Sequence, residues 1–186
     1  MLIEVRWHGR GGQGAWTASN LLAMAVALAG KHTQSFPAFG PERSGAPVLA
    51  FTRISDEPIE IHSMIYNPDI VVVLDPTLLA SVNVVAGLKK GGLIVINYEG
   101  EKDKLFKLLG IQPGEYKVWT VPASKLALDI LKRNITNTAM IGALVKAANL
   151  VDLDNVFKAI KERFPEPVAE KNIELVKKAY EEAREV

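Results

Sequence analysis

The sequence predicts an α/β fold: a doubly wound, mostly parallel sheet with helices on both faces and a helical C-terminal third. Runs such as 70–74 and 93–97 are apolar throughout, and a strand without a polar face is covered on both sides. These runs alternate with helical segments and with short turns that contain glycine and proline. We expect residues 1–186 to form one domain, of which 123–186 is mainly helical.

The first part of the chain predicts a strand, a glycine turn and a helix, followed by further strands. β-branched and aromatic residues cluster in 2–7 without helical spacing, whereas 15–29 is mostly small or straight-chain, with Gly30 placed to end a helix. Apolar or alternating patterns predict three more strands, of which the last two should form a hairpin around a turn at 56–58: 32–36, 48–54 and 59–62.

The rest of the chain continues the alternation and then becomes helical. Asp75 follows the strand 70–74, at the end where ligands of open α/β sheets bind, but it is expected rather to cap a short helix that starts at Pro76. Strands at 93–97 and 116–121 flank a helix at 102–109. Four helices complete the chain, with prolines between the last two: 124–132, 137–144, 153–164 and one from 169 onward.

The glycine turn is the strongest candidate for a binding site. It comprises six residues, four of them glycine: Gly9, Arg10, Gly11, Gly12, Gln13 and Gly14. A turn between a strand and a helix directs unpaired N–H groups and the positive end of the helix dipole at one point, which favours an anion such as phosphate or carboxylate. Alternatively, the glycines only let the helix pack tightly on the strand, although Arg10 and Gln13 argue against this.

The turn also matches the dinucleotide pattern G-x-G-x-x-G, which raises the alternative of a nicotinamide-dependent reductase. That fingerprint includes an acidic residue about twenty positions further on, which holds a ribose hydroxyl. Residues 30–36 contain no acid. The second half of the fingerprint is therefore missing.

A second candidate is the loop 37–47, whose three prolines and two glycines exclude a helix or a central strand. Its centre carries Glu42, Arg43 and Ser44, which suggests a shaped turn that presents a charged pair. A solvated surface loop is the alternative. Phe36 and Phe39 argue against it, because a free loop gains little by exposing two aromatic rings.

Composition excludes several classes of function. Lys and Arg number 22 against 21 for Asp and Glu, so neither nucleic acid nor an anionic membrane is expected as a partner. The absence of cysteine excludes disulfides, thiolate catalysis and cysteine-ligated clusters. With no basic apolar leader and no apolar run near about 20 residues, the cytoplasm is the expected location.

The histidines give no sign of a metal site. His8, His32 and His62 lie far apart in the sequence and lack the spacing typical of metal ligands. His8 precedes the glycine turn and is either a structural residue at a strand end or a group that bonds a substrate.

Four segments together resemble the gamma subunits of 2-oxoacid:ferredoxin oxidoreductases, most closely those of the pyruvate type. They occur in the order and spacing of that family, and the resemblance covers nearly the whole chain. The segments are His-Gly-Arg-Gly-Gly-Gln-Gly at 8–14, Phe-Gly-Pro-Glu-Arg-Ser-Gly-Ala-Pro at 39–47, Asn-Pro-Asp at 67–69 and Asn-Thr-Ala-Met-Ile-Gly-Ala at 137–143.

The resemblance implies an accessory subunit of an enzyme that oxidatively decarboxylates a 2-oxoacid such as pyruvate, transfers the acyl group to coenzyme A and reduces ferredoxin. It implies alpha, beta and delta subunits as partners, which hold thiamine diphosphate, magnesium and iron–sulfur clusters, while this chain holds none and is inactive alone. It places the glycine turn, Glu42, Arg43, Ser44 and Asn137 at the coenzyme A entrance or at a subunit interface. A gamma subunit of a branched-chain or indolepyruvate enzyme, and a purely structural scaffold subunit, are the nearest alternatives.

Overall fold

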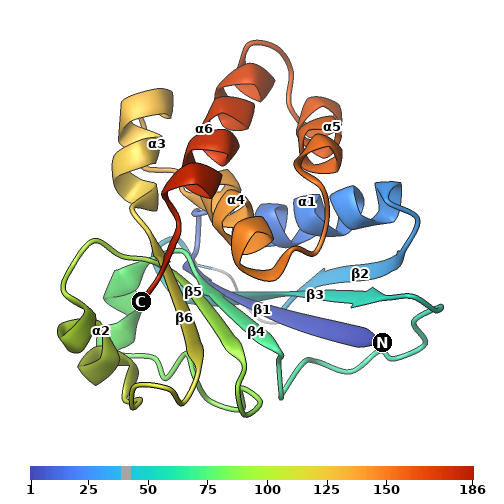
Figure 1. Cartoon of the computed structure of the whole chain (residues 1–186). Coiled ribbons are helices and arrows are strands. Elements are labelled where there is room, and N and C mark those ends of the chain that lie inside the picture. The colour runs from blue at the N-terminus through green and yellow to red at the C-terminus, as the bar shows by residue number, and fades with distance from the viewer. Residues whose placement is uncertain (39–42) are drawn as a thin grey trace.

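A computed structural model describes residues 1–38 and 43–186. The described residues form one seven-stranded sheet in the order β2-β3-β1-β4-β5-β6-β7, with helices packed above and below it (Figure 1). The strands are β1 (Leu2–Arg10), β2 (His32–Pro37), β3 (Pro47–Ser55), β4 (Ile70–Val73), β5 (Leu93–Asn97), β6 (Lys117–Val121) and β7 (Arg184–Glu185).

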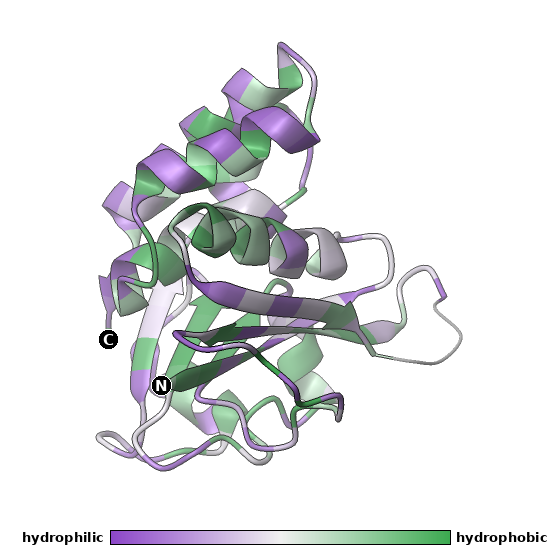
Figure 2. Ribbon diagram, turned by 90° about the vertical axis from the view of Figure 1, so that its right-hand side faces the viewer, coloured by the Kyte–Doolittle hydropathy of each residue, from purple (hydrophilic) through white to green (hydrophobic). Residues whose placement is uncertain are grey.

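The four central strands, β1, β4, β5 and β6, are parallel, and antiparallel strands complete the sheet on both sides. Every residue of β4 and β5 is buried, as their apolar sequences predict. Between the helical layers, these strands are green with hydrophobic residues in Figure 2. The predicted α/β class is therefore confirmed.

Helices cover both faces of the sheet, but unequally. One face carries five helices, which share a large core with the sheet; the other carries α2, the short 3₁₀ helix η1 and irregular segments, which share a smaller core. The helices are α1 (Ala15–Leu28), η1 (Pro76–Ala80), α2 (Lys102–Leu109), α3 (Ala123–Leu131), α4 (Asn137–Ala148), α5 (Leu153–Arg163) and α6 (Val168–Glu182). The helical C-terminal third is thus confirmed, while the assignment of 1–186 to one domain stays a prediction.

The expected hairpin between 48–54 and 59–62 is wrong. β3 pairs with β1 on one side and with β2 on the other, so neither edge remains for a strand at 59–62. That segment instead crosses the sheet as irregular chain and is held by side chains, because Gln34 donates to the carbonyl of Ile61 at 2.8 Å. The hairpin in this part of the fold is β2–β3.

A buried polar cluster fixes α1 on the sheet. Trp7 donates its indole N–H to the hydroxyl of Thr52 at 3.0 Å, and the Ser19 hydroxyl of α1 lies 2.8 Å from the same oxygen. All three residues are fully or almost fully buried. A buried polar group that loses its hydrogen-bond partner destabilises the fold. This cluster therefore holds the start of α1 in a defined position beside the end of β1.

Candidate functional site

The glycine turn joins the carboxyl end of β1 to the start of α1, as the sequence predicts. Gly14 precedes the helix with φ of 79°, in the left-handed region that favours glycine. The backbone N–H groups of Gly12, Gly14 and 15–17 donate to no acceptor within the described residues. They leave a set of unpaired donors at the positive end of the helix dipole, which is the arrangement that binds anions.

The side chains of the turn, by contrast, are already engaged with the end of β4. Gln13 accepts from the backbone N–H of Arg10 at 2.7 Å and donates to Asp75 Oδ2 at 2.7 Å. Arg10 Nε lies 3.4 Å from the same carboxylate oxygen, and its guanidinium donates to the hydroxyl of Thr77 at 3.0 Å. Both residues therefore shape the turn from within.

Asp75 is the centre of this network. Its Oδ1 atom accepts from the N–H of Thr77 at 2.9 Å, which confirms the predicted cap of the following helix. Partial burial favours a higher pKa, but hydrogen bonds from Thr77 and Gln13 and the charge of Arg10 together hold the pKa of Asp75 below its ordinary value of 3.8. The carboxylate is consequently ionised throughout the neutral range.

The second candidate segment packs against the glycine turn through its backbone. Gly11 donates its N–H to the carbonyl of Ala46 at 2.8 Å and accepts from the N–H of Gly45 at 3.1 Å. Arg10 also donates to the carbonyl of Gly45 at 3.0 Å. Arg43 and Ser44 are exposed beside these contacts, so the loop carries the Arg43 side chain to the edge of the turn. Glu42 lies outside the described residues.

Asn137 approaches the same turn from the opposite end of the chain. It is buried at the start of α4 and accepts from the N–H of Thr138 at 2.9 Å, while its amide nitrogen lies 3.5 Å from the carbonyl of Gly14. A Cβ atom added to Gly14 would meet that nitrogen at 2.5 Å, so the two elements are in close contact. The starts of α1 and α4 therefore converge above the carboxyl edge of the sheet.

The structure thus brings together every predicted site residue that it describes, at the edge where ligands of open α/β sheets bind. Sequence reasoning placed Asp75 at a strand end where ligands collect but favoured a role as a helix cap, and it did not assign Thr77 to the site. Sequence reasoning considered His8 but missed Arg6 and the pairing of the two, which are buried on one face of β1. Their signal is the recurrence of polar residues at every second position of β1, from Glu4 to Arg10.

His8 is a neutral residue in this environment. Arg6 donates its Nε proton to His8 Nε2 at 2.9 Å, and burial followed by the charge of Arg6 lowers the pKa of His8 to about 3. With Nε2 as an acceptor, the imidazole carries its proton on Nδ1. His8 can therefore donate one hydrogen bond from Nδ1, and it does not act as a base near neutral pH.

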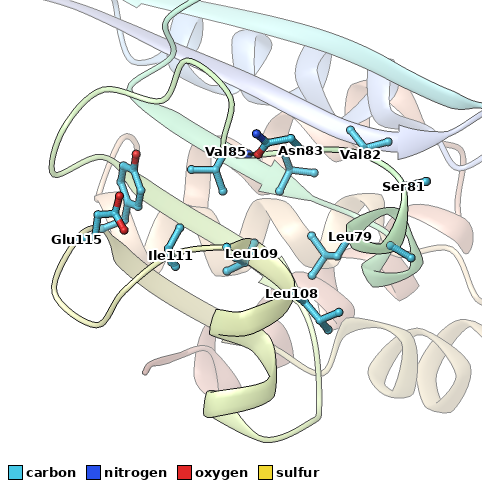
Figure 3. A pocket seen from close by; sticks show the side chains of 13 residues that line it. Leu79, Ser81, Val82, Asn83, Val85, Leu108, Leu109, Ile111 and Glu115 are labelled. Carbon is cyan, nitrogen blue, oxygen red and sulfur yellow. Dashed lines mark hydrogen bonds between the residues drawn. The ribbon is translucent and has the colours of Figure 1, made fainter.

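A separate cavity of about 530 Å³ lies on the α2 face, away from the glycine turn. Figure 3 shows Val82 and Val85 on one side of it and Leu108 and Ile111 on the other, with Glu115 at one end. It brings together no catalytic combination of side chains. Among the described residues, no group of three or more His, Asp and Glu side chains is placed to hold a metal ion, and no helix is long and apolar enough to cross a bilayer.

The strand order argues against a dinucleotide site. In a βαβ dinucleotide unit, the strand after the first helix lies parallel to the first strand and beside it, with its acidic residue at the end. Here β2, the strand after α1, is separated from β1 by the antiparallel strand β3, and it ends at Phe36 and Pro37.

Comparison with known proteins agrees with this arrangement. The family model described as pyruvate ferredoxin/flavodoxin oxidoreductase matches residues 4–182. The chain belongs to this family. The match includes the glycine turn, the loop that packs on it and Asn137, so this family's members share the region in which the site is built.

Relatives within the family align over almost the whole chain. The chain is 52% identical over 179 residues to the pyruvate/ketoisovalerate oxidoreductases common subunit gamma of Thermococcus kodakarensis, covering 96% of each. It is 49% identical over 181 residues to the pyruvate synthase subunit PorC of Methanothermobacter thermautotrophicus, covering 97% of this chain and 96% of the relative. The crystal structure of pyruvate oxidoreductase subunit PORC of Thermotoga maritima superimposes on this chain with a TM-score of 0.87 at 41% identity. The superposition covers 98% of this chain and 97% of that subunit.

Replacing Asp75 by Asn tests the network that shapes the site. We expect the free energy of unfolding near neutral pH to fall by about 1–3 kcal/mol, because an amide nitrogen would face the donors of Gln13 and Arg10. The deficit relative to the wild type should shrink as the pH falls below about 3.8, because Asp75 of the unfolded wild type takes up a proton there while the folded carboxylate, with its lowered pKa, does so only at lower pH. Urea denaturation measures both effects, with the exposed Asp129→Asn as the matched control.

Replacing His8 by Gln tests the buried imidazole. The unfolded wild type gains a proton on His8 below about pH 6.5, whereas the folded protein does not, so its free energy of unfolding should fall as the pH falls from 6.5 towards 3. The slope contributed by His8 approaches about 1.4 kcal/mol per pH unit, and His8→Gln should lack it. Urea titrations from pH 4 to 8 measure the slopes, with the exposed His62→Gln as control. Equal slopes in wild type and His8→Gln would contradict the assignment.

Proposed function

We propose that this chain is the gamma subunit of a pyruvate:ferredoxin oxidoreductase and has no activity alone. The observation that carries the proposal is the near full-length identity of about one half to gamma and PorC subunits, with the glycine turn, the packed loop and Asn137 within the alignment. In the proposed reaction, pyruvate and coenzyme A give acetyl-CoA and CO₂, and two electrons pass to ferredoxin. Thiamine diphosphate, held by other subunits, would supply the decarboxylation chemistry.

The proposed contribution of this chain is to shape the approach of coenzyme A. The unpaired N–H groups at the start of α1 suit a phosphate of that molecule, and the exposed Arg43 beside them suits a second. Arg10 and Gln13 have a different role in this proposal. Their side chains hold the turn in place through Asp75, which leaves the backbone amides available.

Pyruvate is the proposed substrate, although the substrate pocket would lie on other subunits. Pyruvate occurs in the names of all three relatives described above, whereas ketoisovalerate occurs in one. That name describes a gamma subunit common to two enzymes. A chain shared between a pyruvate enzyme and a branched-chain 2-oxoacid enzyme is therefore the nearest alternative for this protein.

Purification from the native host under oxygen-free conditions tests the assignment as a subunit. We expect thiamine-dependent and ferredoxin-like subunits to copurify, because a chain without cysteine needs partners to handle electrons. Mass spectrometry of the purified sample identifies them, and two different sets of partners would support the shared subunit. A lone protein that binds a nicotinamide dinucleotide would overturn the proposal.

Replacing Arg43 by Ala tests the coenzyme A contact in the assembled enzyme. Loss of one charge-assisted phosphate contact is worth roughly tenfold, so we expect KM for coenzyme A to rise by about that factor while assembly is unchanged. Steady-state kinetics with varied coenzyme A measure KM, and size-exclusion chromatography follows assembly. Arg184→Ala, in β7 at one edge of the sheet, serves as control. Loss of assembly in Arg43→Ala alone would favour a scaffold role instead.

A further inference from the structure

The strand β1 carries a buried guanidinium whose charge is not balanced within the described residues. Arg6 is 7% exposed and takes part in none of their ion pairs. Its Nη2 atom donates to the carbonyls of Val84 at 3.0 Å and Ala86 at 2.6 Å, and its Nε atom donates to His8. All three acceptors are uncharged. They satisfy hydrogen bonds of the guanidinium, but they do not neutralise its positive charge.

A neighbouring arginine on the same face of the sheet shows the contrast. Arg53 is 1% exposed and donates from Nε to Glu4 Oε2 at 2.8 Å. Its charge is therefore compensated by a carboxylate. An isolated buried charge is strongly destabilising, and an anion in the same place offsets much of that cost. The environment of Arg6 thus contains every element of a buried ion pair except the anion.

Two side-chain donors at this place have no partner among the described residues, and their residues line a cavity. Neither Nη1 of Arg6 nor Nδ1 of His8 donates to an acceptor among residues 1–38 and 43–186, and neither atom is sealed from solvent. Both side chains line a cavity of about 350 Å³. This volume is near the lower end of the range for small-molecule sites, roughly 300–1,000 Å³.

The cavity wall defines the chemistry of the ligand. Apart from Arg6, His8, the backbone at Gly9 and Asn83, its lining is apolar: Pro47, Val48, Leu49, Leu78, Val82 and Ala86. A monocarboxylate matches the single uncompensated charge and accepts from two donors, while a short aliphatic chain suits the walls. A phosphate dianion would leave one negative charge unpaired beside apolar groups.

We propose that this cavity is a binding site for a carboxylate on a short aliphatic chain, held by Arg6 Nη1 and His8 Nδ1. The side chains of Arg6 and His8 lie on the sheet face that α2 covers, whereas α1 covers the other face. The proposal therefore does not depend on coenzyme A binding. The carboxylate is either a free short-chain acid or the side chain of Asp or Glu on an adjoining subunit, and the test separates these sources.

The test follows the side chains directly by NMR of the full chain labelled with ¹⁵N in arginine and histidine. Acetate and pyruvate are the probes, acetamide is the uncharged control, and inorganic phosphate is the dianion. We expect saturable shifts of the Arg6 Nε and His8 Nδ1 signals with Kd on the order of 1 mM for the two carboxylates. Acetamide and phosphate should bind at least about tenfold more weakly.

A cavity-filling variant keeps both donors and provides the matched control. Ala86 is exposed, lines the cavity and bonds Arg6 through its backbone carbonyl, which a substitution keeps, so Ala86→Phe should weaken carboxylate binding by at least about tenfold. Ala80→Phe introduces the same side chain at an exposed position outside this cavity and should leave binding unchanged. Absence of saturable shifts at Arg6 and His8 in the wild type would overturn the proposal, as would equal weakening by both variants.

The assembled enzyme distinguishes the two sources. Binding of acetate to both the lone chain and the assembly would support a free acid. Binding to the lone chain only, with weaker assembly of Ala86→Phe than of Ala80→Phe, would support a carboxylate from an adjoining subunit. These outcomes are independent of the Arg43→Ala experiment. The acetate-binding and assembly measurements do not depend on the affinity for coenzyme A.

Discussion

The carboxylate of Asp75 holds together parts of the molecule that are far apart along the chain. It accepts from Gln13 in the glycine turn and from Thr77 in the next connection, and it lies beside Arg10. A turn made largely of glycine has few side chains with which to fix its own shape, and glycine loses more conformational freedom on folding than other residues. Fixed hydrogen-bond partners outside the turn offset this cost.

In the six-residue glycine turn, the side chains and the backbone have different roles. The side chains of Arg10 and Gln13 are directed inward to Asp75, Thr77 and the loop backbone, whereas several backbone N–H groups of the turn and of the helix start stay available. The charged and polar side chains thus fix the geometry of the turn, and its free backbone N–H groups are of the kind that can bind an anion. The cation that remains exposed, Arg43, comes from a different segment.

Sequence patterns predicted the elements better than their partners. The apolar runs of β4 and β5 and the glycine turn needed only local information. The pairing of β3 did not follow from its pattern, because alternation shows which face is buried but not which strand lies alongside. Asp75 was expected as a cap, yet its bond to Gln13 spans 62 positions and depends on which strands are neighbours. Asn137 was found through the family resemblance alone, since nothing local distinguishes it.

One physical requirement explains why Arg6 and Arg53 are buried on the same face of the sheet. On the face opposite α1, irregular chain and not a helix covers β2, β3 and β1, and buried carbonyls of irregular chain need donors from elsewhere. Arg53 supplies them to Ser63 at 2.7 Å, and Arg6 supplies them to the segment that contains Val84. One requirement thus explains why charged side chains recur on the inner face of these strands.

That requirement accounts for hydrogen bonds but not for charge. A neutral donor such as Gln34 meets the same need at Ile61, so a carbonyl acceptor alone does not call for an arginine. Arg53 meets it with a carboxylate beside it, which makes the pair neutral. Arg6 has the same inward position and a neutral histidine in place of the acid. Since burying a net charge is unfavourable, the balancing anion is the part of this arrangement that the described residues do not supply.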